Sequence, residues 1–235
     1  MTVKIGWTPY KRVSDPKNIH FQSDIEAIDM LYFEPERLNY YKNSSSLFMK
    51  CPAVTGFHQK FFVIKSPFDL ELTYDRNKQD VRISESQKFY DQFVSWRKDE
   101  YGENERPLFS FLFQYMFVAD EPVWIETYPA FLHGQPENTQ YIPGSFDIYN
   151  WFRPIDFSFQ MIDDTKPVTI KRGQPLFYLK FNSKKLNDNF KMKRIEWTDD
   201  LFKQNKRCSP HNWVRGLSWK LMLNGNPFRP KRMVK

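Results

Sequence analysis

The chain has 235 residues, a formal net charge of +7 and an aromatic content of 18%, with 23 Phe. This length suits one large domain, and the two cysteines, Cys51 and Cys208, are too few for a disulfide framework or a thiolate metal site. Both are expected to be free thiols in a reducing cytosol. The N-terminus shows no apolar segment of the kind found in signal peptides. The longest apolar run, 108–118, is too short to span a bilayer as a helix. We therefore expect a soluble protein that does not associate with a membrane.

The first strands are predicted in the second quarter of the chain. Residues 61–64 form a short apolar run that ends at Ser66-Pro67, and proline fits the edge or the first residue of a strand. In residues 68–75 apolar and polar side chains alternate, which is typical of a strand with one buried face. Aromatic side chains pack well on pleated surfaces, so the high ring content also favours a β-rich core.

One helix is predicted among the strands, over residues 86–101. Ser84 or Ser86 can cap its first turn, and Gly102 can end it. Its apolar side chains are three and four residues apart: Phe89, Phe93 and Trp96. This spacing is typical of an amphipathic helix.

Short strands then follow one another with turn signals between them. The predicted strands are 108–118, 123–128, 145–152, 155–162, 168–171 and 176–181, with a turn at 172–175 between the last two. The short connections leave no room for the helices that a parallel α/β fold requires. The sequence therefore predicts a mainly β protein, an antiparallel β-sandwich or jelly roll with one inserted helix.

The pattern changes at about residue 183. Thr198 can cap a short helix that runs to Lys206, and a second helix is predicted over 209–223, with Pro210 at its first position. We therefore divide the chain into a β-sandwich domain, 1–182, and a basic, helical C-terminal extension, 183–235, packed on it.

Charge is unevenly distributed along the chain. Residues 165–235 contain 18 Lys and Arg against 4 Asp and Glu, whereas the rest of the chain is net acidic. Such an asymmetry can mark an anionic partner, and a solvated face or a contact with the protein's own acidic body are the alternatives that stay open. Within the Pro-framed tail, three residues are the predicted polyanion contacts: Arg229, Lys231 and Arg232.

Several catalytic chemistries have no motif in this chain. The four histidines lack metal-ligand spacing, and no phosphate-binding glycine motif or nucleophile elbow occurs. Neighbouring acids such as Asp163-Asp164 and Asp199-Asp200 are typical of turns and helix starts. No metal and no cofactor is predicted, and the sequence favours a protein that is not an enzyme.

The densest cluster of polar and aromatic side chains lies in residues 143–154. Alternate side chains of a strand point to opposite faces, so four of them are predicted to share one face: Asp147, Tyr149, Trp151 and Arg153. A carboxylate, two amphipathic rings and a guanidinium can together bind a planar or anionic ligand. The preceding predicted strand extends this face with Trp124, Glu126 and Tyr128. An ordinary sheet surface with an Arg–Asp pair is the alternative that stays open.

The middle of the chain also carries a series of short motifs. They are Cys51-Pro52, Ser66-Pro67-Phe68-Asp69-Leu70, Pro143-Gly144 with Asp147, Trp151 with Arg153-Pro154, and Gly173-Gln174-Pro175-Leu176. Over residues 45–182 the series resembles a family of uncharacterised β-rich proteins of tailed phages, including marine T4-like phages, and of some bacteria. The resemblance implies a phage origin and no known activity. The Gly-x-Pro-Leu turn also resembles a segment of the dUTPase-like β-fold, whose nucleotide and metal motifs are not evident here.

The favoured interpretation is a non-enzymatic phage protein of the host cytoplasm that binds an anionic partner. That partner is a nucleic acid, a nucleotide or an acidic protein surface. Two alternatives stay open: an enzyme of nucleotide or small-molecule metabolism with an unrecognised site, and a virion structural subunit.

Overall fold

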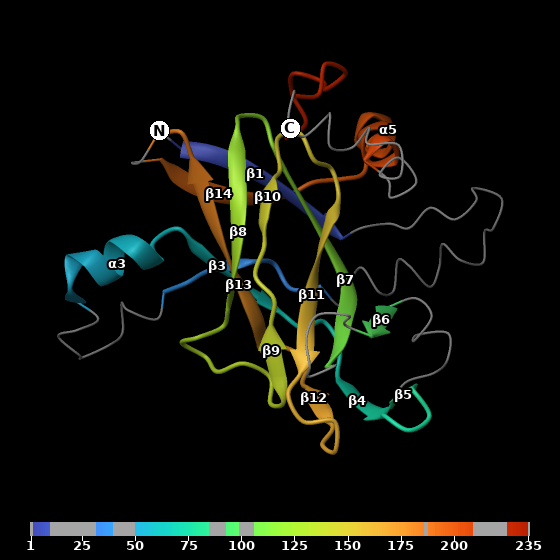
Figure 1. The fold of residues 1–235 in the computed structure, drawn as a ribbon. Coiled ribbons are helices and arrows are strands. Elements are labelled where there is room, and N and C mark those ends of the chain that lie inside the picture. Colours follow the sequence, from blue (N-terminus) through green and yellow to red (C-terminus); the bar gives the residue numbers. More distant parts are fainter. Residues whose placement is uncertain are drawn as a thin grey trace.

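The computed structural model describes residues 2–9, 32–39, 50–84, 93–98, 106–185, 188–208 and 225–234. These residues form a mainly β structure with three sheets, in which almost all neighbouring strands are antiparallel (Figure 1). The described residues include two helices, α3 (Pro52–His58) and α5 (Asp199–Arg207). Among them, neither helix has the length and apolar character needed to cross a membrane.

The largest sheet has the strand order β14-β1-β7-β11-β9, and β6 also pairs with β7. Its strands are β1 (Thr2–Pro9), β6 (Val94–Lys98), β7 (Pro107–Ala119), β9 (Thr139–Tyr141), β11 (Pro154–Met161) and β14 (Asn189–Arg194). β1 and β14 are parallel, so the sheet joins the N-terminal strand to a strand from the basic C-terminal third.

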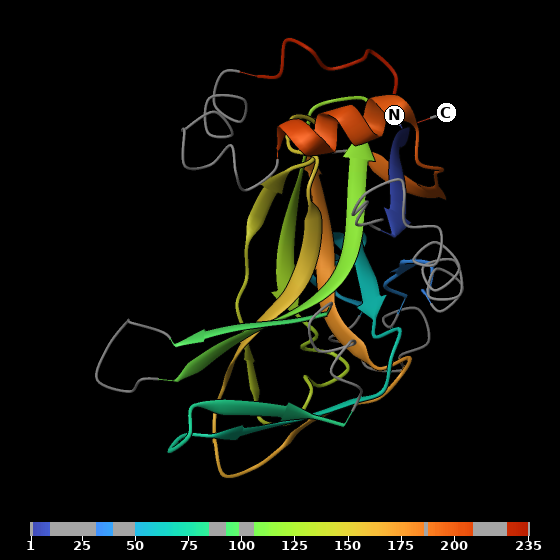
Figure 2. The same cartoon turned by 90° about the vertical axis from the view of Figure 1, so that its right-hand side faces the viewer.

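The second sheet has the order β10-β8-β13-β3-β2, and a small third sheet has the order β12-β4-β5. The second sheet contains β2 (Glu36–Arg37), β3 (Phe61–Lys65), β8 (Val123–Pro129), β10 (Ser145–Asp147) and β13 (Pro175–Ser183). The third contains β4 (Leu70–Asp75), β5 (Asp80–Ile83) and β12 (Val168–Ile170). The third sheet lies at one end of the molecule, and α5 lies across the other end (Figure 2). Residues 225–234, which we call the C-terminal segment, lie at the same end as α5.

Aromatic rings fill the space between the two larger sheets. Phe117 of the first sheet contacts Phe181 of the second with ring centroids 6.3 Å apart, and Tyr141 stacks on Phe177 at 5.5 Å. All four rings are buried. The high ring content therefore builds the core, as expected from the packing of aromatic side chains on pleated surfaces.

Most strands predicted from alternation are present, but the predicted helix over 86–101 is wrong where the structure describes it. Residues Val94–Lys98 form β6 and pair with β7 from Val94↔Phe111 to Lys98↔Pro107. Residues 86–92 and 99–101 of that prediction lie outside the described residues. The strand predicted over 145–152 is shorter than expected, because β10 ends at Asp147.

The C-terminal third is only partly helical where it is described. The predicted helix that Thr198 caps is confirmed as α5, and the Thr198 hydroxyl accepts the hydrogen bond from Leu201 N. The predicted boundary at residue 182 falls inside β13, and the next element is a strand, β14, rather than a helix. The helix predicted over 209–223 lies outside the described residues.

Candidate functional site

Asp147, the first residue of the predicted ligand-binding face, ends β10 instead of continuing it. Its Oδ1 accepts hydrogen bonds from the backbone N of Tyr149 at 2.9 Å and of Asn150 at 3.2 Å. Its Oδ2 accepts a third, from Asn150 Nδ2 at 2.8 Å. A carboxylate used in this way stabilises a turn. The strict alternation expected over 145–152 therefore breaks after Asp147.

The break changes which side chains meet. Trp151 stacks on Phe146 with centroids 5.3 Å apart and an interplanar angle of 25°, although the two were predicted on opposite faces. Arg153 lies over the Trp151 ring at 5.6 Å, so these two predicted residues do lie together. Tyr149 is separated from them and stacks with Arg229, whose guanidinium carbon is 4.0 Å from the ring centroid.

The predicted extension of this face by β8 agrees with the strand pairing. Asp147 lies opposite Trp124, and Ser145 lies opposite Glu126. The Tyr128 hydroxyl donates to Glu126 at 2.8 Å, and Lys180 lies 3.6 Å from the same carboxylate. Burial raises the pKa of Glu126, but the hydrogen bond from Tyr128 and the charge of Lys180 help to hold this pKa below its ordinary value. The Glu126 carboxylate is therefore paired within the protein, as on an ordinary sheet surface.

Arg229, one of the three predicted polyanion contacts, is buried. Its side chain is 3% exposed, and its Nε donates to Tyr149 O at 2.8 Å. Its two other nitrogens donate to the carbonyl oxygens of Pro230 and Ala119, and Asp120 lies 3.5 Å away. Burial lowers the pKa of this guanidinium, and the Asp120 carboxylate opposes that effect. These bonds of Arg229 all go to the protein itself, and its contact with a polyanion stays a prediction.

Instead, Arg229 and Asp120 fix the C-terminal segment to the body. The Asp120 carboxylate accepts hydrogen bonds from the backbone N of Met233 and of Val234. Lys231 and Arg232, between these anchors, are exposed. The two remaining predicted polyanion contacts are thus held at a defined place on the surface.

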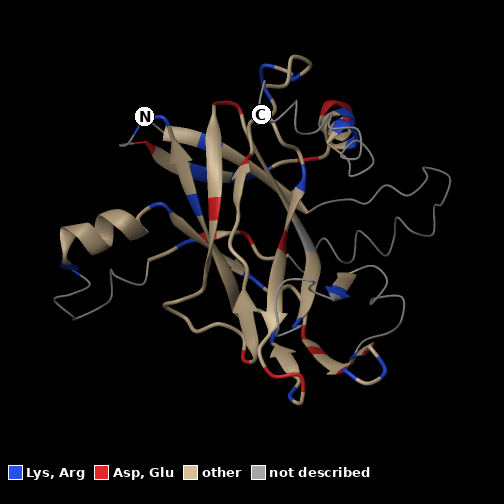
Figure 3. Ribbon diagram, viewed as in Figure 1, with Lys and Arg blue, Asp and Glu red and all other residues tan. Residues whose placement is uncertain are grey.

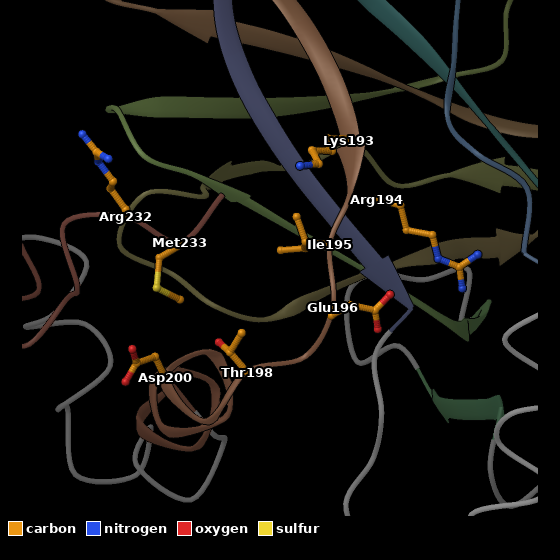
Figure 4. Close-up of a pocket in the computed structure, with 8 residues that line it drawn as sticks. All are labelled: Lys193, Arg194, Ile195, Glu196, Thr198, Asp200, Arg232 and Met233. Atoms are coloured by element: carbon orange, nitrogen blue, oxygen red, sulfur yellow. The ribbon is translucent and has the colours of Figure 1, made fainter. Parts of the chain in front are cut away.

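A pocket of about 330 Å³ opens beside this segment, between the end of β14 and the start of α5. Figure 4 shows Ile195 and Met233 as its apolar walls, with cationic and polar side chains around them. The side chains that matter for its chemistry are Lys193, Ile195, Thr198, Asp200, Arg232 and Met233. Arg194 and Glu196 also border the pocket but extend away from Met233.

A glycine of β1 allows the wall of the pocket to approach the sheet closely. A Cβ on Gly6 would lie 2.9 Å from Ile195 Cδ1 and 3.2 Å from Val234 Cγ2. Such distances are too short for ordinary packing, so Ile195 and Val234 occupy the space that a side chain at this position would need. The pocket and the C-terminal segment are therefore fitted to β1.

Three exposed lysines continue from the pocket along β14 and β1. Lys4 lies opposite Lys191, and Gly6 lies opposite Lys193, in the parallel pairing of the two strands. Opposed residues point to the same face, so Lys4, Lys191 and Lys193 share the outer face of the sheet. Arg232 borders the pocket that Lys193 also lines. We call these four residues the basic ridge; Figure 3 shows the Lys and Arg positions on β1 and β14. Within the described part of the chain, Lys4, Lys191 and Arg232 have no acidic partner.

Sequence reasoning missed most of the basic ridge, although a signal was present. In β14, Phe190 and Met192 alternate with Lys191 and Lys193, and β1 has the same alternation around Lys4. This pattern is typical of strands with one basic face.

In the described ranges, no three His, Cys, Asp or Glu side chains are grouped as metal ligands.

No protein-family model matches the sequence, and no curated protein is similar to it. The function is therefore inferred from the chemistry of the chain's own residues.

Proposed function

We propose that the chain is a non-enzymatic β-sandwich protein that binds a nucleic acid through the basic ridge. The observation that carries this proposal is the pairing of Lys4 with Lys191, two exposed cations directly opposite each other in neighbouring strands. Lys193 and Arg232 extend the same positive surface. The motif resemblance to phage proteins supports a place in the cytoplasm of an infected host.

Like charges at opposed positions destabilise a sheet, because their repulsion is not relieved within the protein. Neighbouring strands lie about 4.8 Å apart, so the ammonium groups of Lys4 and Lys191 share one small region of the surface. A phosphate placed between them replaces this repulsion with two attractions. Phosphate contacts also release the counterions condensed on a nucleic acid, which adds to the affinity.

A phosphate backbone fits the arrangement better than a single compact anion. The positive groups follow β14 from Lys191 to Lys193 and then pass to Arg232 on the C-terminal segment. Contacts of this kind read no base sequence, so the proposed binding is largely independent of sequence.

The test is the salt dependence of binding to a fluorescently labelled single-stranded oligonucleotide, measured by anisotropy. For wild type, the logarithm of the affinity should fall linearly with the logarithm of the salt concentration between about 50 and 200 mM. The double variant Lys4→Gln/Lys191→Gln should bind more weakly, with a salt slope reduced by about 1.4, because each phosphate contact on a single strand contributes about 0.7.

The matched control removes the same charge from the opposite end of the molecule. Lys78→Gln/Lys171→Gln changes two exposed lysines next to β4 and β12, far from the basic ridge. This control should keep the wild-type affinity and slope. Equal losses in the two double variants would mean that only net charge matters, and the proposed surface would be wrong.

A further inference from the structure

One large aromatic ring of the C-terminal segment is left in solvent. Phe228 is 64% exposed, the highest value among the large hydrophobic residues in the described part of the chain. It lies at the end of the molecule that carries α5 (Figure 2). A single exposed ring is common on protein surfaces, so the surroundings of Phe228 decide whether it can serve a ligand.

The backbone that presents this ring is fixed to helix α5. A turn spans residues 226–229, in which Arg229 N donates to Asn226 O at 3.1 Å. The Asn226 side chain accepts from Phe228 N at 3.1 Å and donates to Gln204 Oε1 at 2.8 Å. Gln204 Nε2 donates to Phe228 O at 2.7 Å. Because Asn226 and Gln204 are both buried, this network holds Phe228 at one place before any ligand arrives.

Positive charge lies beside the ring without covering it completely. The Arg207 guanidinium carbon lies over the Phe228 ring, 4.5 Å from its centroid. Since Phe228 is 64% exposed although Arg207 covers one face, the other face of the ring is open to solvent. Lys203 is exposed one helical turn before Arg207, and Lys231 is exposed three residues after Phe228. Within the part of the chain that the structure describes, Lys203 and Lys231 have no acidic partner.

We infer that the open face of Phe228 stacks with a base of a single-stranded nucleic acid, whose phosphates contact Lys203 and Lys231. This inference rests on the proposed function and restricts its ligand to single strands, because the bases of a duplex are already stacked on one another. Aromatic rings with cations beside them are the usual means of holding a single strand, and Arg207 adds a cation–π contribution. Every base has a face that can stack, so this contact is as independent of sequence as the phosphate contacts are.

The C-terminal segment links Phe228 to the basic ridge. The turn that holds Phe228 fixes one end of the segment, and Asp120, which accepts from Met233 N, fixes the other. Between these anchors Lys231 and Arg232 are exposed, and Arg232 belongs to the basic ridge. A strand stacked on Phe228 therefore meets positive charge along the segment in the direction of the ridge.

The first experiment compares an oligothymidine strand with an abasic strand of the same length by fluorescence anisotropy. Phe228→Ala should bind oligothymidine at least about fivefold more weakly than wild type, because stacking of a base on a ring contributes to the affinity. The abasic strand and a DNA duplex offer phosphates without accessible bases, so wild type and Phe228→Ala should bind each of them equally. An unchanged affinity for oligothymidine would overturn the inference.

Two further variants locate the effect at this ring. Phe131→Ala is the matched control, because Phe131 is 44% exposed and follows the end of β8 that lies away from Asp120. It should bind oligothymidine as wild type does, and an equal loss in both alanine variants would contradict the stacking site. Phe228→Trp should keep the affinity, and bound oligothymidine should quench its added indole beyond the quenching seen in wild type. Absence of this extra quenching would also count against stacking.

The remaining outcomes separate this inference from the proposed function. Weaker oligothymidine binding in Lys4→Gln/Lys191→Gln with no change in Phe228→Ala refutes the stacking site and leaves the proposed function intact. Absence of any oligonucleotide binding by wild type refutes both. An exposed ring beside cations can also meet an anionic lipid surface. Binding to phosphatidylserine vesicles that Phe228→Ala abolishes, with oligothymidine binding unchanged, would assign the ring to a membrane surface and overturn the inference.

Discussion

Arg229→Met removes a buried guanidinium and keeps much of its aliphatic volume. The Arg229 side chain is 3% exposed and donates to the carbonyl oxygens of Ala119, Tyr149 and Pro230. A buried carbonyl left without its donor costs about 1–3 kcal/mol. Removing one partner of a buried ion pair costs about 3–5 kcal/mol, but Asp120 keeps two backbone N–H donors after the change. We therefore expect the free energy of unfolding to fall by about 3–5 kcal/mol.

Urea unfolding followed by tryptophan fluorescence measures this loss as a lower midpoint at an unchanged m-value. Arg232→Met is the matched control, because Arg232 is exposed and lies three residues along the same segment. It should change the free energy of unfolding by less than about 0.5 kcal/mol. A loss below about 1 kcal/mol for Arg229→Met would show that the carbonyl oxygens do not depend on this guanidinium.

Three further outcomes follow from buried or crowded groups. Gly6→Ala should lower the free energy of unfolding by about 1–3 kcal/mol in urea, because its methyl group would lie 2.9 Å from Ile195; unchanged stability would contradict this close approach. Partial burial and the nearby charge of Lys65 lower the pKa of His133 below its ordinary 6.5. Around that pH the unfolded chain binds more protons than the folded protein, so the free energy of unfolding rises with pH. A titration midpoint of His133 at or above 6.5, measured by NMR, would exclude this. Burial raises the pKa of the Cys208 thiol, so iodoacetamide should alkylate Cys51 first in the native protein, and equal rates would speak against a buried Cys208.

The elements that sequence predicts well are those whose signal is local. In β11, four apolar side chains alternate with polar ones, and the structure buries every second residue as that alternation requires. Helix α5 is capped by Thr198, whose side chain accepts a hydrogen bond from the backbone N of Leu201. Neither inference needs knowledge of a distant partner.

Elements whose identity depends on distant partners are predicted less well. Phe93 and Trp96 have helical spacing, yet both rings pack into the core beside strands, and Val94–Lys98 pairs with β7. Tertiary pairing overrides a weak periodicity here, since a few rings fit either a helix or a strand. β14 depends on β1, from the opposite end of the chain, and no local pattern identifies that parallel neighbour.

The residues of the predicted ligand-binding face do not all lie together, for a different physical reason. Asp147 has a carboxylate that can bind its own backbone, and this turn ends the strand on which the predicted face depended. The face from Asp147 to Arg153 is consequently divided, with Trp151 and Arg153 together and Tyr149 against Arg229. Strand alternation predicts a face only as far as the strand extends.

The net charge of a segment is a poor measure of the charge that it presents to a partner. In the basic C-terminal third, Arg229 is buried against carbonyl oxygens, Lys180 lies beside Glu126, and Arg194 lies over the Trp7 ring. Lys4, by contrast, comes from the part of the chain that is acidic overall, and β1 places it opposite Lys191. The basic ridge is therefore a product of strand pairing, because a parallel β1–β14 contact gathers on one face cations that the sequence separates by most of its length.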